Sequence, residues 1–384
     1  MTTVLRGITW QNPRGYEPLV AAAAAWQAAH PHIEVIWDQL PWYRFEEHVL
    51  GSLAAGDGRY DLIMFDHPWT GTLAAERWLV PWDELVAPSY LDAARRRVVA
   101  PSLESYELGG RLWALPLDAA CHAALTRSDL VDPAGLPGAW EDVAAWARDQ
   151  HRPPARYGLV LSVEGVLGHC LFLSAMAALG HPAYHDEANP TCDRAAAAHA
   201  LTLFRDLLRF APPGSARWGP WDIYDHLCRH DDVAYSPSIF AYVNYFGGGP
   251  RGDALRLGLA PRFDGHAAPR PILGGVGLGI AHTCPHLSDA RDFGLFLMGD
   301  HTQRTIFPNH HGQPATWSAW RDDELNRRSH SFYRDLAANM AHAYVRPRYP
   351  GFHALELRNG QILQGWWEGA RTLSDTLAAL NATG

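Results

Sequence analysis

The first 65 residues alternate short apolar runs with longer helical stretches, and this alternation limits the possible folds most strongly. Runs of strand length cover residues 4–10, 33–38 and 60–65, and helical patterns cover 16–30 and 45–55 between them. Strands separated by helices of this length form right-handed βαβ units, which build a parallel sheet. The third run is apolar almost throughout, as expected of a strand buried on both faces.

The rest of the chain mixes helices, shorter strands and polar connections. Helical spacing of apolar residues covers 140–149, 161–179 and 194–210, a helix with Ser288 as N-cap is expected over 288–298, and 322–384 is expected to be helical apart from an interruption at 346–350. Strand-like segments cover 233–246, 255–259 and 272–281. A chain of 384 residues is too long for one ordinary core, so we expect two or three domains.

Composition excludes several classes of function. The net charge is −9, and an acidic surface argues against a nucleic-acid partner, which needs clustered basic residues. All 32 basic residues are arginine, so lysine-dependent Schiff-base and P-loop chemistry is excluded. No run approaches the roughly 18 apolar residues of a membrane span, so no membrane insertion is expected. Five cysteines without a CxxC motif do not indicate a disulfide framework.

The sequence as written starts MTTVLRGITW, without a basic segment followed by an apolar one. Such a start does not direct export. The expected location is therefore cytoplasmic as written, or periplasmic or extracellular if the N-terminus was trimmed.

The loops that follow the first three strands carry polar groups beside aromatic rings. Ligands of a parallel sheet bind beyond the carboxyl ends of its strands, and this mixture suits a small polar ligand with apolar faces. We therefore predict ligand contacts from Trp10, Asn12, Arg14, Tyr16, Trp42, Asp66, His67 and Trp69. The alternative is that these loops only cap helices. Arg14 suits a ligand carboxylate or phosphate, and equally a salt bridge on the surface or between lobes.

Two further patterns do not indicate a functional site. His226 and His230 are spaced to face one side of a helix, but no HExxH motif or third ligand accompanies them, so no metal is expected. The glycine-rich segment 274–279 lies inside a strand pattern and opens no helix, so it is not a dinucleotide-binding loop. Close approach of backbone between lobes explains these glycines better, and no cofactor is expected.

Five segments carry a resemblance that runs along nearly the whole chain. They are GRLWALPLDAACHAAL at 110–125, TRSDLVDPAGLPGAWEDVAAWARD at 126–149, PILGGVGLGIA at 271–281, ARDFGLFLMGDHTQRTIFPNHHGQP at 290–314, and the closing stretch at 346–380. In this order they resemble family 1 of the extracellular solute-binding proteins, the binding components of ABC importers for sugars and related solutes.

The resemblance implies an α/β, two-lobed periplasmic-binding-protein fold of type II, with discontinuous lobes joined by a hinge. Lobe one would take 1–115 plus 273–317, and lobe two 116–272 plus 318–384, with crossings near Leu115, Gly274 and Trp317. A carbohydrate-like solute would bind in the cleft between the lobes, in a monomer that serves an ABC permease. The further contacts predicted on this basis are Asp118, Trp218, Trp221, Tyr242, Asn244, Tyr245, Gly274, Gly275 and Asn309.

A rival hypothesis is a cytoplasmic enzyme or metabolite sensor built on the same fold. A closing cleft excludes water and strengthens acid–base groups, and Asp66, His67 and Asp118 would be the first candidates for a cyclisation, isomerisation or lyase step. The sequence supplies no motif for such chemistry, so a binding protein is favoured over an enzyme.

Overall fold

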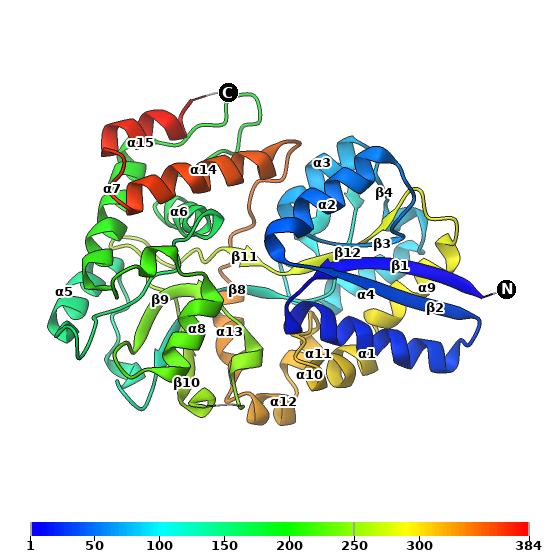
Figure 1. The fold of residues 1–384 in the computed structure, drawn as a ribbon, viewed down its shortest axis with the longest axis horizontal. Coiled ribbons are helices and arrows are strands. Elements are labelled where there is room, and N and C mark those ends of the chain that lie inside the picture. The colour runs from blue at the N-terminus through cyan, green and yellow to red at the C-terminus, as the bar shows by residue number, and fades with distance from the viewer. Residues whose placement is uncertain (1, 249, 383–384) are drawn as a thin grey trace. The chain divides into compact units, whose positions relative to one another are not determined.

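A computed structural model of the protein describes residues 2–248 and 250–382, apart from the side chain of residue 43. The chain divides into two compact units, each made of several separate segments (Figure 1). The first unit contains Met1–Ala119, Gly274–Arg327 and Arg348–Gly351. The second contains Ala120–Leu273, Arg328–Pro347 and Phe352–Gly384.

These boundaries differ from the predicted ones by one residue at Gly274 and by more at three other places. The first unit extends to Ala119 instead of 115, and it keeps 318–327, so that Trp317 lies inside it and not at a crossing. It also includes the short segment Arg348–Gly351. Arg348 Nη2 donates to the Glu107 carbonyl oxygen at 2.7 Å, and the Gly351 N–H donates to Thr72 at 3.1 Å, which attaches this segment to the first unit.

The first unit is built on a mixed sheet with strand order β2-β1-β3-β12-β4, and β7 also pairs with β12. Its strands are β1 (Thr3–Trp10), β2 (Ile33–Leu40), β3 (Leu62–Asp66), β4 (Leu79–Val80), β7 (Leu115–Pro116) and β12 (Val276–Ala281). The first three strands are parallel, as predicted, whereas β12 runs antiparallel to its neighbours. Figure 1 shows α1 (Pro13–Ala29) and α2 (Trp42–Ala55) on opposite faces of this sheet, as two right-handed crossovers of opposite direction require.

The remaining elements of the first unit are short. They are the helices α3 (Thr70–Ala75), α4 (Pro88–Arg97), α9 (Leu287–Leu297), α10 (Phe307–Asn309), α11 (Trp317–Trp320) and α12 (Asp323–Arg328), the hairpin β5 (Glu107–Leu108) with β6 (Arg111–Leu112), the 3-10 turns His67–Trp69, Trp82–Glu84 and Glu104–Tyr106, and the π-helix Thr302–Ile306. The core of the unit lies along the sheet, where Leu5, Ile8, Leu62, Ile63 and Met64 are fully buried.

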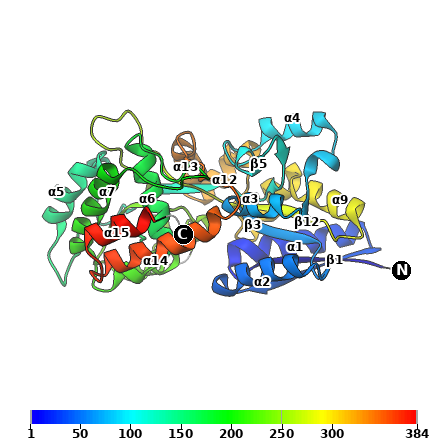
Figure 2. The ribbon, with the colours of Figure 1, turned by 90° about the horizontal axis from the view of Figure 1, so that it is seen from above.

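The second unit has a small antiparallel sheet and a layer of helices. Its strands are β8 (Ala120–Arg127), β9 (Tyr235–Phe240), β10 (Leu255–Gly258) and β11 (Leu273–Gly274), with β8 in the centre. Its helices are α5 (Trp140–Gln150), α6 (Val166–Ala178), α7 (Arg194–Leu207), α8 (Pro220–Arg229), α13 (Phe332–Met340), α14 (Phe352–Trp367) and α15 (Leu373–Leu380). Figure 2 shows α6, α7, α14 and α15 gathered into one layer.

Two predicted element boundaries are wrong for local reasons. Ser288 does not cap α9, because the helix already begins at Leu287 and its N-cap is His286. The helix expected from 161 begins only at Val166, because Gly165 precedes it with φ +51° and Val160 N–H donates to the Tyr235 carbonyl oxygen at 3.0 Å. Nowhere in the described residues does a helix combine the length and apolarity that crossing a membrane requires.

Candidate functional site

The ends of three strands meet at one edge of the first unit's sheet. β1 ends at Trp10, β3 ends at Asp66, and Asp66 lies opposite Val276, the first residue of β12. Most of the residues predicted from the strand-end loops lie at this edge. We call the following residues the strand-end cluster: Trp10, Asn12, Arg14, Tyr16, Trp42, Asp66, His67, Trp69 and Asp118.

Aromatic rings form a continuous chain through the strand-end cluster. The ring centroids of Trp10 and Trp42 are 5.1 Å apart, those of Trp42 and Phe45 are 6.1 Å apart, and those of Phe45 and Trp69 are 5.9 Å apart. Trp42 is 37% exposed, whereas Trp10 and Trp69 are buried. The sequence analysis missed Phe45, although its position one helical turn after Trp42 was a usable sign. Trp42 therefore presents an aromatic surface to solvent and packs against the buried rings of Trp10 and Phe45.

Two predicted residues at the start of α1 make local contacts. Asn12 is the N-cap of the helix, and its side chain accepts a hydrogen bond from the Arg14 N–H at 3.0 Å. Tyr16 is half-buried, and its hydroxyl donates to Glu17 at 3.4 Å. The capping alternative therefore holds for Asn12, whose side-chain oxygen is engaged by the helix.

Asp66 and His67 are held at the end of β3. The Asp66 carboxylate accepts from the His67 N–H at 2.8 Å and lies 3.1 Å from His67 Nδ1. The His67 side chain is only 1% exposed and its ring packs edge-on against Tyr106. The Tyr106 hydroxyl contacts the carbonyl oxygens of Phe65 and Gly275 at 3.2 and 3.3 Å, which ties β3 to the chain just before β12. No pattern in the sequence pointed to Tyr106.

Arg14 and Asp118 form a buried ion pair, although 104 positions separate them in the chain. Arg14 Nε donates to Asp118 Oδ2 at 3.0 Å, and Nη2 donates to the same oxygen. Asp118 Oδ1 accepts the Val276 N–H at 2.6 Å. Of the two roles that the sequence left open for Arg14, the structure displays a salt bridge, and it lies within the first unit.

The segment around Asp118 is fixed by several further bonds. Gln303 donates to the Leu117 carbonyl oxygen at 3.3 Å, and Gln313 donates to the Ala119 carbonyl oxygen at 2.6 Å. Gly275 has φ +107°, and a Cβ there would lie 2.9 Å from the Asp118 carbonyl oxygen. Gly275 is therefore required by both its backbone conformation and its close approach to Asp118.

The first unit also contains two other predicted residues. Gly274 is buried and ends β11. Asn309 is exposed and ends α10, on a different element from the strand ends.

The second unit brings most of its predicted contact residues together around α8. The ring centroids of Trp221 and Tyr242 are 6.1 Å apart, and Tyr224 stacks on Tyr245 at 4.7 Å. The Tyr242 N–H donates to the Tyr224 hydroxyl at 3.3 Å. Within the described residues, the buried Oδ1 of Asn244 has no hydrogen-bond partner. We call Trp221, Tyr224, Tyr242, Asn244 and Tyr245 the tyrosine cluster; the sequence analysis missed Tyr224, one helical turn after Trp221.

One acidic residue, Asp225, contacts the tyrosine cluster. The Tyr245 hydroxyl donates to Asp225 at 3.1 Å. Burial, followed by the charge of Asp225, raises the pKa of Tyr245 well above its usual value, so the hydroxyl stays protonated and donates. Partial burial and the charge of Asp222 raise the pKa of Glu164, which precedes α6. The ring of Trp218 lies 4.8 Å from that of His226.

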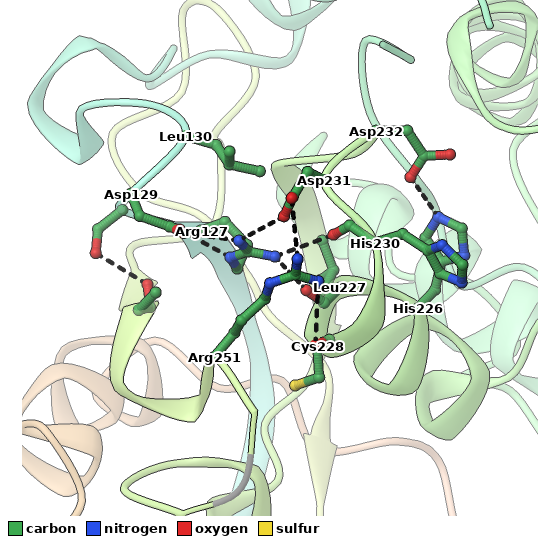
Figure 3. A network of polar contacts seen from close by, with 12 residues as sticks. Arg127, Asp129, Leu130, His226, Leu227, Cys228, His230, Asp231, Asp232 and Arg251 are labelled. Carbon is green, nitrogen blue, oxygen red and sulfur yellow. Dashed lines mark hydrogen bonds and ion pairs between the residues drawn. The ribbon is translucent and has the colours of Figure 1, made fainter. Parts of the chain in front are cut away.

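The far end of α8 is held by the arginine network drawn in Figure 3. Arg127, the last residue of β8, is almost fully buried and binds the carboxylates of Asp129 and Asp231. Its Nη1 also donates to the carbonyl oxygens of Leu227 and His230. Guanidinium donors thus satisfy the C-terminal carbonyl groups of the helix that carries Trp221.

The histidine pair noted in the sequence belongs to the same network. The rings of His226 and His230 stack at 4.5 Å, and His226 Nε2 lies 2.7 Å from Asp232 (Figure 3). Across the described residues, no three histidine, cysteine, aspartate or glutamate side chains are arranged to hold a metal ion.

Sequence comparison identifies the family. The profile of the bacterial extracellular solute-binding proteins matches residues 10–303, which is most of the chain. The chain belongs to this family. Comparison with curated protein sequences finds no match.

Solved structures of other solute-binding proteins share the fold over nearly the whole length. Maltose-bound MalE3 of T. maritima is 18% identical, with a TM-score of 0.86 over 99% of this chain and 98% of its own. A ribitol complex from Agrobacterium radiobacter is 17% identical, with a TM-score of 0.86 over 99% and 97%. A D-mannitol complex from Agrobacterium vitis is 18% identical, with a TM-score of 0.81 over 99% and 97%. The predicted α/β fold of a periplasmic binding protein is confirmed.

Proposed function

We propose that this solute-binding protein binds a small polyhydroxylated solute, a sugar or a polyol, without transforming it. The observation that carries the proposal is the exposed ring of Trp42 packed against Trp10 at the strand ends. An aromatic face of this kind stacks on the apolar face of a sugar, while neighbouring polar groups bind its hydroxyls. The family membership and the maltose, ribitol and D-mannitol held by structurally similar proteins support the same ligand class.

The tyrosine cluster supports a polyol ligand independently. Asn244 Oδ1 is a buried acceptor without a hydrogen-bond partner among the described residues, and such groups are rare unless a ligand or water completes them. The hydroxyl of a sugar is a suitable donor. That this cluster and the strand-end cluster contact the same solute is a prediction from the sequence and stays one.

Binding is tested by titrating the full chain with maltose, ribitol and D-mannitol in a calorimeter, supported by thermal-shift measurements. A solute that binds the folded state raises the melting temperature, and above Kd the rise grows with the logarithm of its concentration. We expect at least one of the three to bind. If none of them stabilises the protein at millimolar concentration, the proposed ligand class is wrong.

The place of binding is tested with a matched pair of tryptophan variants. Trp42→Ala removes the exposed ring of the strand-end cluster and should weaken binding about tenfold or more, as loss of a central aromatic contact does. Trp78→Ala is the control, because Trp78 precedes β4, which pairs with the opposite end of β12 at Ala281. Equal effects of the two variants would contradict a site at the strand ends.

We infer that the protein works outside the cytoplasm and delivers its solute to an ABC permease. The family description as extracellular supports this inference. Fractionation of the producing cells is the test. Recovery of the protein with the secreted or periplasmic fraction is expected, and recovery with cytosolic enzymes alone would contradict export.

A further inference from the structure

The position of Arg14 is one from which a cation would recognise an anionic ligand. It lies in the first turn of α1, directly after the carboxyl end of β1. Guanidinium groups bind carboxylates and phosphates through two parallel hydrogen bonds. If Arg14 were turned to the solute, sugar acids or sugar phosphates would be its natural ligands.

The chain supplies that anion itself. The Arg14 and Asp118 side chains are only 4% and 8% exposed, and two guanidinium nitrogens of Arg14 bind Asp118 Oδ2. The second carboxylate oxygen is held by the Val276 N–H at 2.6 Å. Gly275 allows this arrangement, because a Cβ at that position would lie 3.0 Å from Asp118 Oδ1. Asp118 is therefore fixed in the position that a ligand carboxylate would take.

The charges beside the tyrosine cluster are also unfavourable to an anion. Asp225 binds the Tyr245 hydroxyl, and Asp222 directly follows Trp221 on α8. The nearby Arg229 is paired with Asp225 at 3.1 Å, four positions earlier on α8. Farther along, Arg127 and Arg251 bind Asp231 (Figure 3).

We propose that Asp118 is an internal counterion of Arg14 that makes this protein select uncharged polyhydroxylated solutes over the corresponding sugar acids. This inference rests on the proposed function and specifies its substrate class. An incoming carboxylate would have to displace Asp118 from Arg14, which would leave a buried carboxylate without its cation. Alternatively it would bind near Asp118 and meet like-charge repulsion. Both outcomes disfavour the anion.

Matched solutes test the selectivity of the unaltered protein. In each pair a carboxylate replaces one CH2OH group: maltitol and maltobionate, ribitol and ribonate, D-mannitol and D-mannonate. In calorimetric titrations at low ionic strength, we expect each anion to bind at least about tenfold more weakly than its neutral partner. A tenfold rise in Kd corresponds to a loss of about 1.4 kcal/mol of binding free energy. An anion that binds as tightly as its neutral partner, or more tightly, overturns the inference.

Variants test whether Asp118 is the cause. Asp118→Asn removes the internal anion but keeps an oxygen that can accept the Val276 N–H. Anion affinity relative to the neutral solute should then rise about tenfold or more. The double variant Arg14→Gln, Asp118→Asn should lose that gain, because it lacks the cation. If Asp118→Asn folds and its selectivity equals that of the unaltered protein, Asp118 is not the determinant.

The outcomes separate the two proposals. If no neutral or anionic solute binds, the proposed function fails and the selectivity fails with it. If neutral solutes bind and anions bind equally well, only the selectivity fails. Should Asp118→Asn not fold, the matched solutes on the unaltered protein still decide between selectivity and its absence.

Discussion

Buried arginines lie at or near strand ends in both units of the protein, and Arg14 and Arg127 are satisfied in different ways. In the second unit, Arg127 binds two carboxylates that are themselves 47% and 56% exposed, and it also binds backbone carbonyl groups. In the first unit, Arg14 binds the carboxylate of Asp118, which is buried with it. The carboxylates that bind the guanidinium are thus half exposed at Arg127 and buried at Arg14.

This difference has consequences for stability and for binding. Loss of one half-exposed carboxylate leaves Arg127 with the other, whereas loss of Asp118 removes a buried carboxylate from a buried guanidinium. The Arg127 network fixes a helix end, while the Arg14 pair joins the start of α1 to the residues before β12. We therefore expect loss of the Asp118 carboxylate to lower stability more than loss of one of the carboxylates bound to Arg127.

The largest effect is expected from Asp118→Ala. Removing one partner of a buried ion pair costs about 3–5 kcal/mol of unfolding free energy. Asp129→Ala is the matched control in the second unit and should cost less than about 1 kcal/mol, because the Asp129 side chain is half exposed and Asp231 remains. Urea unfolding followed by circular dichroism measures both. Equal losses in the two variants would erase the distinction between the units.

The next effect is expected from Arg127→Met in the second unit. The carbonyl oxygens of Leu227 and His230 lose their donor, which costs about 2 kcal/mol of stability. Because α8 carries Trp221, solute affinity should fall as well. Arg251→Met is the control, since Arg251 binds Asp231 at the surface. If Arg251→Met is as damaging as Arg127→Met in both measurements, burial of Arg127 is not what matters.

Acid should affect the second unit through two buried histidines. Burial, with a smaller contribution from Arg346, lowers the pKa of His122 and of His169 to about 3. Unfolded imidazoles bind protons below about pH 6.5 while the folded ones do not, so stability is present above that pH and falls as the pH drops toward 3. Each histidine contributes a slope of about 1.4 kcal/mol per pH unit at the limit.

Variants separate this effect from general acid denaturation. His169→Gln should flatten the fall in unfolding free energy between pH 6.5 and 4.5. His199→Gln, at a histidine with a 51% exposed side chain, should leave it unchanged. Urea titrations at several pH values measure the slope. An unchanged slope in His169→Gln would mean that His169 does not remain neutral in the folded protein.

The smallest effect is the difference between two glycine substitutions in the first unit. Gly275→Ala and Gly110→Ala both place alanine at positive φ, +107° and +76°. Around Gly110 nothing lies within 4 Å of a Cβ, whereas at Gly275 the Cβ meets Asp118. We expect Gly275→Ala to cost about 1 kcal/mol more than Gly110→Ala, because it adds close contact to a similar backbone strain. A smaller loss at Gly275 would show that Asp118 can shift freely.

Much of the first unit could be predicted because its information is local. The apolar run before Asp66 and the helical spacing after Trp10 and Trp42 determine βαβ units, and these place the strand ends at one edge. The aromatic residues at those ends were found for this reason. The resemblance of five segments led us to expect two units that are each discontinuous in sequence, and periodicity alone does not indicate this.

The parts that could not be predicted depend on distant pairing. Arg14 meets Asp118 only because β12 pairs antiparallel with β3 and β7, which brings Val276 to Asp66 and fixes the neighbouring segment. Tyr106 joins the site through two backbone carbonyl groups and belongs to no motif. A helix start such as Val166 depends on Gly165 at φ +51° and on the extended segment before it, which apolar spacing does not reveal.

The most direct test of a strand-end solute site is a crystal structure of the full chain with whichever of maltose, ribitol and D-mannitol binds most tightly. We expect the solute against the rings of Trp42 and Trp10, with the Arg14 guanidinium still bound to Asp118. A solute bound away from both tryptophans, or one whose oxygen has replaced Asp118 on Arg14, would contradict it.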